Sequence, residues 1–191
     1  NIWGSSGGED GKSPIAGRNL QNAEVILTYL PDVVGLQECS PAARSGSGSI
    51  IKLLSAEYTE VPVTFTNKNN NNYTPLLYRA QRLELLESGY HLYGGLNDAD
   101  SKSVTWGAFK DRDTGKVFIA ASTHLWWQSG EESDAAREAQ ANELDELLSQ
   151  LRQKYGCDAI VFGDFNSTVS TKGCGTLLEK GYVSAQASAE S

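Results

Sequence analysis

The stretch Val161-Phe162-Gly163-Asp164-Phe165-Asn166 decides the fold and the site that we predict for this chain. The apolar run from Ala159 to Phe162 predicts a short strand buried on both faces, and it stops at Gly163. Residues i and i+2 of an extended segment point to the same side, so Asp164 and Asn166 are expected to face one ligand together. Gly163 removes a side chain where backbone and ligand would crowd. Taken alone, the stretch is equally compatible with a polar turn, because Gly, Asp and Asn are common turn residues.

An apolar run that ends in a polar side chain occurs twice more. Residues 33–36 precede Gln37 and Glu38, and residues 117–123 precede His124. If these strands are neighbours, Glu38, His124 and the Asp164/Asn166 pair converge at one rim of the sheet. Each has an ordinary alternative: a surface or capping glutamate, a hydrogen-bonded structural histidine, and a turn. Taken together they favour a functional site.

The side chains at these strand ends predict a hard divalent cation. Two carboxylates, an imidazole and an amide oxygen are suitable ligands, whereas a soft-metal cluster would need thiolates. An oxygen-rich rim with few ligands suits Mg²⁺, which keeps its waters and meets substrate phosphate. The chemistry that follows is attack of water on phosphorus, with a carboxylate orienting or deprotonating the water and an imidazole assisting at an oxygen of the phosphate.

The periodicity of the remaining chain predicts an α/β protein without internal repeats or a domain boundary. Apolar residues at helical spacing predict helices at 18–30 and 133–155, and Gly156 stands where a C-terminal glycine belongs. Ser47 or Ser49 is expected to cap a second helix, and a last short helix is expected at 173–179. Strands are predicted at 32–38, 58–65, 74–79, 83–86, 103–110 and 116–123, the last two forming a hairpin.

Charge and composition narrow the class of substrate. The 191 residues carry a net charge of −8, and the basic residues nearest to a cluster are Arg79, Arg82, Lys102, Lys110, Arg112 and Lys116. A protein that grips a long nucleic acid usually has a basic face, so a small or lipid-like phosphorylated substrate is favoured. No apolar run approaches 18 residues, so no membrane span is expected. The three cysteines lack CxxC spacing and are expected to be free thiols or to form one disulfide, which leaves the compartment open, cytoplasmic or secreted.

The same residues carry a resemblance to the endonuclease/exonuclease/phosphatase superfamily, the DNase I-like phosphoesterases, over essentially the whole chain. Five segments resemble family motifs in the right order: Asn1-Ile2-Trp3, Val34-Gly35-Leu36-Gln37-Glu38, Thr74-Pro75-Leu76-Leu77-Tyr78-Arg79, Ser122-Thr123-His124-Leu125 and Gly163-Asp164-Phe165-Asn166. The resemblance implies a four-layer α/β sandwich, with two mixed β-sheets face to face and helices outside. It also implies hydrolysis of a phosphoester with Mg²⁺ or Mn²⁺.

The resemblance assigns a role to each matching residue. Glu38 would hold the metal, with Asn1 close by and contributing to the metal site. Asp164 would position and activate the water, and Asn166 would hold the phosphate and the transition state. His124 would contact phosphate and assist the leaving group.

One family feature is missing from the sequence. The family pattern closes with an Asp-His pair on a final strand, and no histidine follows Asn166 here. We therefore expect residues 1–191 to be a single domain that lacks most of its first strand and its C-terminal strands. The parent protein is expected to be active, and these residues alone weak or inactive.

The substrate is left open by the sequence. Lys102, Arg79 and the pair Trp126-Trp127 are the candidate substrate-binding residues, although core packing is as good an explanation for the tryptophans. Nucleic acid, a phospholipid head group and an inositol phosphate are the substrate classes we consider, acted on by a monomer. The competing interpretation is a non-catalytic module that binds phosphate or a partner on the same scaffold. A serine hydrolase is disfavoured, because no G-x-S-x-G motif is present.

Overall fold

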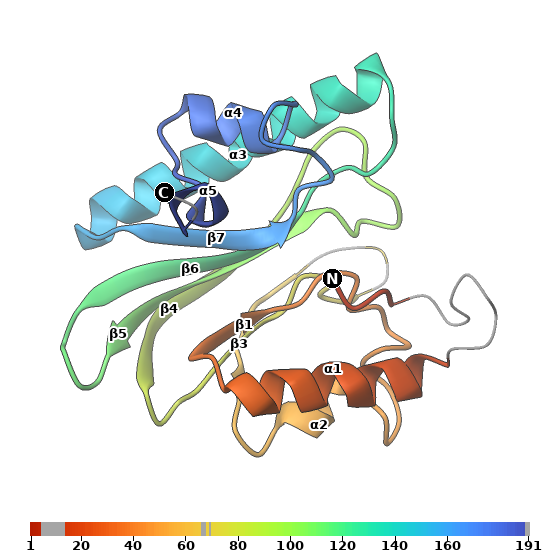
Figure 1. The fold of residues 1–191 in the computed structure, drawn as a ribbon, viewed down its shortest axis with the longest axis vertical. Coiled ribbons are helices and arrows are strands. Elements are labelled where there is room, and N and C mark those ends of the chain that lie inside the picture. The colour runs from red at the N-terminus through yellow and green to blue at the C-terminus, as the bar shows by residue number, and fades with distance from the viewer. Residues whose placement is uncertain (5–13, 66–67, 69, 190–191) are drawn as a thin grey trace.

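The fold is a sandwich of four layers. The computed structural model describes residues 1–4, 14–65, 68 and 70–189. Helices α1 and α2, a sheet, a second sheet, and helices α3 and α4 lie one above another (Figure 1). The helices are α1 (Ile15–Tyr29), α2 (Ile50–Leu54), α3 (Glu131–Tyr155), α4 (Cys174–Glu179) and α5 (Ala185–Ala189). The strands are β1 (Val33–Gly35), β2 (Thr59–Glu60), β3 (Leu76–Tyr78), β4 (Leu83–Leu92), β5 (Ser103–Asp111), β6 (Val117–His124) and β7 (Ala159–Asp164). The predicted α/β sandwich is confirmed.

Two sheets form the centre of the sandwich. Sheet A has the strand order β1-β3-β2, and both of its pairings are antiparallel among the described residues. Sheet B has the order β4-β5-β6-β7 and is mixed, because β6 and β7 run parallel. Parallel neighbours need a long crossover, and α3 supplies it between β6 and β7. The parallel register places His124 opposite Asp164, so these two side chains leave the same end of sheet B.

Strand β7 is not buried on both faces, and that expectation was wrong. Phe162 packs between the sheets and Val161 packs toward α3 and α4, but Ile160 is 56% exposed. Among the described residues β7 pairs with β6 alone and ends sheet B. Sheet A is short, so the start of β7 extends past it (Figure 1). An unbroken apolar run therefore marked a strand here without marking its position in the sheet.

The two sheets touch where β1 ends, and this contact places Glu38. A Cβ at Gly35 would collide with the Phe162 ring and with Ser122 of β6, so glycine is what lets the sheets approach. Just beyond, the Gln37 Nε2 donates to the Ser122 Oγ at 3.2 Å, and that hydroxyl donates to the Leu36 carbonyl at 3.2 Å. The chain leaving β1 is thereby fixed over the end of β6, where His124 lies.

The predicted helices form with small shifts at their ends. Helix α3 begins at Glu131, two residues before the expected start, and ends at Tyr155 with Gly156 in the left-handed conformation at φ 61°. Ser49 caps α2 by accepting from the Lys52 backbone amide. In the described ranges no helix is both long and apolar enough to cross a membrane. All three cysteines are free thiols.

Replacing Gly163 with alanine is expected to lower the free energy of unfolding by about 1–3 kcal/mol. A Cβ at this position would collide with the carbonyl oxygen of Thr123 on β6, so the crowding comes from the neighbouring strand rather than from a ligand. Urea unfolding followed by circular dichroism measures the effect. The matched control is Gly17→Ala, in an exposed turn of α1 with open space around the new methyl group, which should raise stability by about 0.5–1 kcal/mol. Equal midpoints for Gly163→Ala and the parent would contradict this packing argument.

Candidate active site

The amide of Asn1 holds two carboxylates side by side. Its Nδ2 donates to the Glu38 Oε1 at 2.8 Å and to the Asp164 Oδ2 at 2.8 Å. Its Oδ1 accepts from the Trp3 backbone amide at 2.8 Å, which fixes the direction of the side chain. Glu38 comes from the end of β1 and Asp164 from the end of β7, so residues from both sheets meet at one rim.

Glu38 and Asn166 at this rim have backbone conformations that L-residues rarely adopt. Glu38 has φ 59° and Asn166 has φ 48°, both in the left-handed region. Such a conformation costs about 1–3 kcal/mol for most non-glycine residues and persists only where the surroundings enforce it. Gly4 packs against the Glu38 carbonyl, where any Cβ would collide. Asn166 donates from its backbone amide to the Asp164 Oδ1 at 3.0 Å and from its side chain to the Leu125 carbonyl at 2.9 Å.

Lys102 and His124 form the opposite, cationic side of the site. The Lys102 side chain is only 4% exposed, and its Nζ lies 3.4 Å from the His124 Nε2 and 3.5 Å from the Asp98 Oδ1. Burial, reinforced by the positive charge of Lys102, lowers the pKa of His124 to about 4, so this imidazole is neutral at pH 7. Burial also lowers the pKa of Lys102, against the attraction of Asp98.

Asp164 keeps its negative charge at neutral pH. Burial alone would raise its pKa, but the hydrogen bonds from the Asn1 side chain and the Asn166 backbone amide bring the pKa below its usual value. The site therefore presents carboxylates on one side and a buried ammonium on the other. Such an arrangement suits a metal–phosphate pair, because the carboxylates attract the cation and the ammonium attracts the anion.

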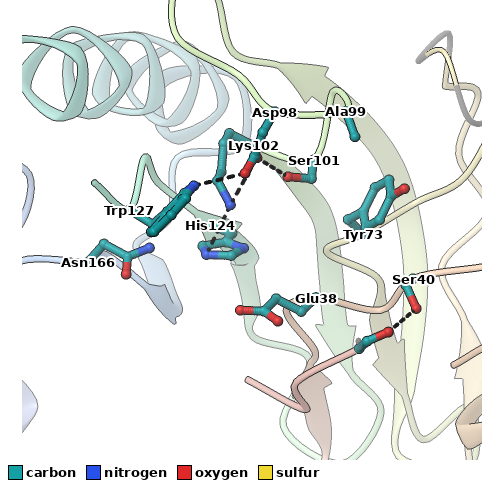
Figure 2. Close-up of a pocket in the computed structure, with 11 residues that line it drawn as sticks. Glu38, Ser40, Tyr73, Asp98, Ala99, Ser101, Lys102, His124, Trp127 and Asn166 are labelled. Atoms are coloured by element: carbon teal, nitrogen blue, oxygen red, sulfur yellow. Dashed lines mark hydrogen bonds and ion pairs between the residues drawn. The ribbon is translucent and has the colours of Figure 1, made fainter. Parts of the chain in front are cut away.

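Glu38, Lys102, His124 and Asn166 line one cavity of about 490 Å³, and the Asn1–Asp164 hydrogen bond lies beside it, outside the set of lining residues. Figure 2 shows Glu38, Lys102, His124, Trp127 and Asn166 around this cavity. These residues belong to strand ends, to segments that follow strands and to the loop between β4 and β5. The remaining lining residues are Gly4, Ser40, Tyr73, Asp98, Ala99 and Ser101. This volume is typical of clefts that bind small molecules.

The structure separates the candidate substrate-binding residues into two groups. Lys102 and Trp127 line the cavity, and Trp127 is 52% exposed. Trp126 is 7% exposed, and its Nε1 donates to the Ser133 Oγ at 3.1 Å, so this ring belongs to the packing against α3. Arg79 follows β3 at the end away from Tyr73 and the cavity, and its guanidinium lies 3.7 Å from Asp32 and 3.8 Å from Glu57. The structure therefore does not bring Trp126 or Arg79 to the cavity.

Sequence reasoning missed Asp98, which lies on the loop between β4 and β5. Its Oδ1 accepts from the Ser101 Oγ at 2.8 Å, its Oδ2 accepts from the Trp127 Nε1 at 2.8 Å, and Lys102 is its ion-pair partner. The loop matches no motif. The available signal was an Asn97-Asp98 pair in the loop before β5, the strand that begins at Ser103 next to Lys102.

The donor set fits a magnesium-like ion. Within the described ranges, no three His, Cys, Asp or Glu side chains group closely enough to hold a metal by themselves. The rim offers two carboxylates joined through one amide. Mg²⁺ is commonly bound through one or two carboxylates plus water and substrate phosphate, so a sparse oxygen site is what this ion takes.

Comparison with known proteins places the chain in a family. The fold is a sandwich of two sheets, and polar side chains from the strand ends of both sheets meet at one rim. The chain belongs to the Endonuclease/Exonuclease/phosphatase family, which it matches over residues 1–187. The resemblance carried by the five sequence segments is thereby confirmed. A search of curated proteins found no match.

Solved structures with the same fold share little sequence with this chain. An endonuclease/exonuclease/phosphatase family protein from Bacteroides thetaiotaomicron has 20% identity and a TM-score of 0.80, covering 95% of this chain and 66% of its own. The human nocturnin catalytic domain has 23% identity and a TM-score of 0.72, with coverages of 95% and 67%. A mannosyl-6-phosphatase from B. thetaiotaomicron has 20% identity and a TM-score of 0.77, with coverages of 95% and 68%. The chain thus spans about two thirds of the length of these structures.

Proposed function

We propose that this protein is a divalent-metal-dependent phosphoesterase that hydrolyses a phosphodiester or phosphomonoester with an activated water. One observation carries the proposal: the Asn1 amide binds the Glu38 and Asp164 carboxylates together, and the site also holds the buried Lys102–His124 pair. Membership of the Endonuclease/Exonuclease/phosphatase family supports the same reaction class.

Each side chain has a task in this proposal. Glu38 holds Mg²⁺ or Mn²⁺, which when bound neutralises charge on the phosphate. Asp164, charged at neutral pH, orients the attacking water and accepts its proton. Asn166, which lines the cavity, holds the phosphate.

The hydrogen bonds made by His124, Lys102 and Asn1 suggest a role for each of these residues. His124 is neutral, so it acts by contacting phosphate through hydrogen bonding, while Lys102 supplies the positive charge. A metal-ligand role for Asn1 would use its Oδ1, which accepts from the Trp3 amide. We assign Asn1 instead to aligning the two carboxylates.

Removing divalent metal is expected to abolish hydrolysis. The parent protein, in its longest available form, should turn over a generic aryl phosphomonoester or phosphodiester with Mg²⁺ or Mn²⁺, and turnover should stop in chelator and return when metal is restored. Mg²⁺ at 100 times its Kd should also stabilise the fold by about 2.7 kcal/mol, measured as a rise in Tm. Glu38→Gln should remove that rise. Glu84→Gln, on the exposed side of β4, is the matched control and should keep it.

The outcomes separate the proposal from its alternative. Persistent turnover in chelator would reject metal dependence. A metal-dependent rise in Tm without hydrolysis of any ester, including in the longest available form of the protein, would favour the non-catalytic binding module. An equal rise in Glu38→Gln would remove Glu38 from the metal site.

A further inference from the structure

Trp127 presents an indole ring to the cavity that holds Lys102 and His124. The ring is 52% exposed, whereas the preceding Trp126 is almost wholly buried, with the two ring centroids 6.3 Å apart. Figure 2 shows Trp127 standing beside Asp98 and above Asn166 at the edge of the cavity. A large, exposed aromatic ring next to an anion-binding group offers a flat apolar surface at a fixed position from a phosphate.

Asp98 fixes the orientation of this ring. One carboxylate oxygen accepts from the Trp127 Nε1 at 2.8 Å, and the other accepts from the Ser101 Oγ at 2.8 Å and lies 3.5 Å from the Lys102 Nζ. Burial alone would raise the pKa of Asp98, but the hydrogen bond from Ser101, the positive charge of Lys102 and the hydrogen bond from Trp127 bring the pKa below its usual value, so Asp98 is a carboxylate at neutral pH. Asp98 thus joins the ring of Trp127 to the ammonium of Lys102.

The loop that carries Asp98 is itself fixed. The Asn97 Nδ2 donates to the carbonyls of Tyr93 at 3.1 Å and Lys102 at 2.9 Å, and the Lys102 backbone amide donates to the Asn97 Oδ1 at 2.8 Å. These bonds close the loop across its base, where β4 ends and β5 begins. A preorganised ring costs less entropy on binding than one that must be ordered by the ligand.

We propose that Trp127 is the stacking platform for a ring in the leaving group of the substrate, and that Asp98 is the residue that positions it. The inference rests on the proposed function and names its substrate class: a small phosphoester whose phosphate lies at Lys102 and His124 and whose attached group carries a sugar or nucleobase ring. Among the described residues that line the cavity, Lys102 is the one lysine or arginine. A single cationic side chain favours a small ligand over a long polyanion.

Binding measurements can test the platform apart from catalysis. The probes are glucose 6-phosphate, adenosine 5′-monophosphate, glycerol 3-phosphate and inorganic phosphate, titrated with Mg²⁺ into protein that also carries Asp164→Asn, so that esters are not consumed. In that background Trp127→Ala is expected to weaken the favoured ring-bearing probe by about 5- to 150-fold. Glycerol 3-phosphate and inorganic phosphate should bind as before. The sugar and nucleotide arms tell which ring is preferred.

A second pair of variants tests Asp98 as a positioning residue. Trp127→Phe keeps a ring but lacks the Nε1 donor. Asp98→Ala should lower the ratio of ring-bearing to inorganic phosphate affinity in protein with Trp127, and should leave that ratio unchanged in Trp127→Phe protein. Using the ratio cancels the effect of Asp98 on Lys102, which both probes share. A purely structural role for Asp98 would lower the ratio equally in both backgrounds.

The failures of the two proposals are distinguishable. If Trp127→Ala binds every probe as the parent does, or if no ring-bearing probe binds more tightly than glycerol 3-phosphate, the platform is rejected even where the enzyme hydrolyses esters. If the ring preference depends on Trp127 but no ester is hydrolysed by protein with Asp164 intact, the platform stands and the proposed hydrolysis fails.

Discussion

Replacing Asp164 with asparagine is expected to lower kcat for phosphoester hydrolysis by about 10²–10⁴-fold. The substitution removes the negative charge that would orient and deprotonate water. The Asp164 Oδ2 accepts from Asn1 and the Oδ1 accepts from the Asn166 backbone amide, and the single amide oxygen of asparagine can keep only one of these two bonds. Losing one hydrogen bond costs about 1 kcal/mol, so the fold should survive. Steady-state kinetics with saturating Mg²⁺ give kcat, and a urea titration gives the stability of the same preparation.

Asp158→Asn is the matched control. It makes the same change of charge just before β7, at the end of the strand away from the cavity, on an exposed residue. Its kcat should equal that of the parent. If Asp164→Asn retains the parental kcat, Asp164 is not the base, and if the two variants lose activity equally, the effect comes from net charge rather than from position.

The sequence was sufficient to predict the fold class and the strand ends that meet. The Leu144, Leu148 and Leu151 stripe of α3 is periodic because one face of that helix packs on sheet B, so its burial pattern is written locally in the chain. Glu38, His124 and Asp164 could be singled out because each ends an apolar run. A shared sheet brings together only His124 and Asp164, at the ends of β6 and β7. Glu38 follows β1 of sheet A and reaches the same rim because the two sheets pack face to face.

What the sequence could not predict depends on contacts between distant segments. Ile160 and Val161 are both apolar, yet one is exposed because sheet A is too short to cover the start of β7. Trp126 and Trp127 are adjacent and identical in type, and only the position of Ser133 and Asp98 decides which ring is buried. Such differences arise from tertiary packing, and the local periodicity of the sequence does not report them.

Gly163 shows the same limit in a different form. The absence of a side chain at Gly163 was expected to leave room for a ligand. The space is instead needed by the Thr123 carbonyl of the neighbouring strand. A glycine at a strand end indicates close approach, but the identity of the approaching group depends on which strand lies beside it. Here that strand is β6, and the close approach is what sets His124 against Asp164.

Replacing His124 with alanine is expected to lower kcat by about 10²–10³-fold, the usual effect of removing one group that stabilises charge in a transition state. The substitution removes a phosphate contact and also the neighbour of the Lys102 Nζ, which lies 3.4 Å from the His124 Nε2. Because the chain has two histidines, His91→Ala is a matched control. His91 is on β4, where its Nε2 lies 2.7 Å from the Glu143 Oε2, and its side chain is 43% exposed.

The contrast between the two histidine variants separates catalysis from folding. An exposed pair such as His91–Glu143 contributes little to stability, so His91→Ala should keep both the parental kcat and the parental Tm. His124→Ala creates a cavity beside a buried lysine and should lower Tm as well. His124→Gln refills most of that space with a polar side chain, so a Tm close to the parent with kcat still reduced would assign the loss to the missing imidazole. A parental kcat in His124→Gln would instead show that the imidazole only fills space at the end of β6.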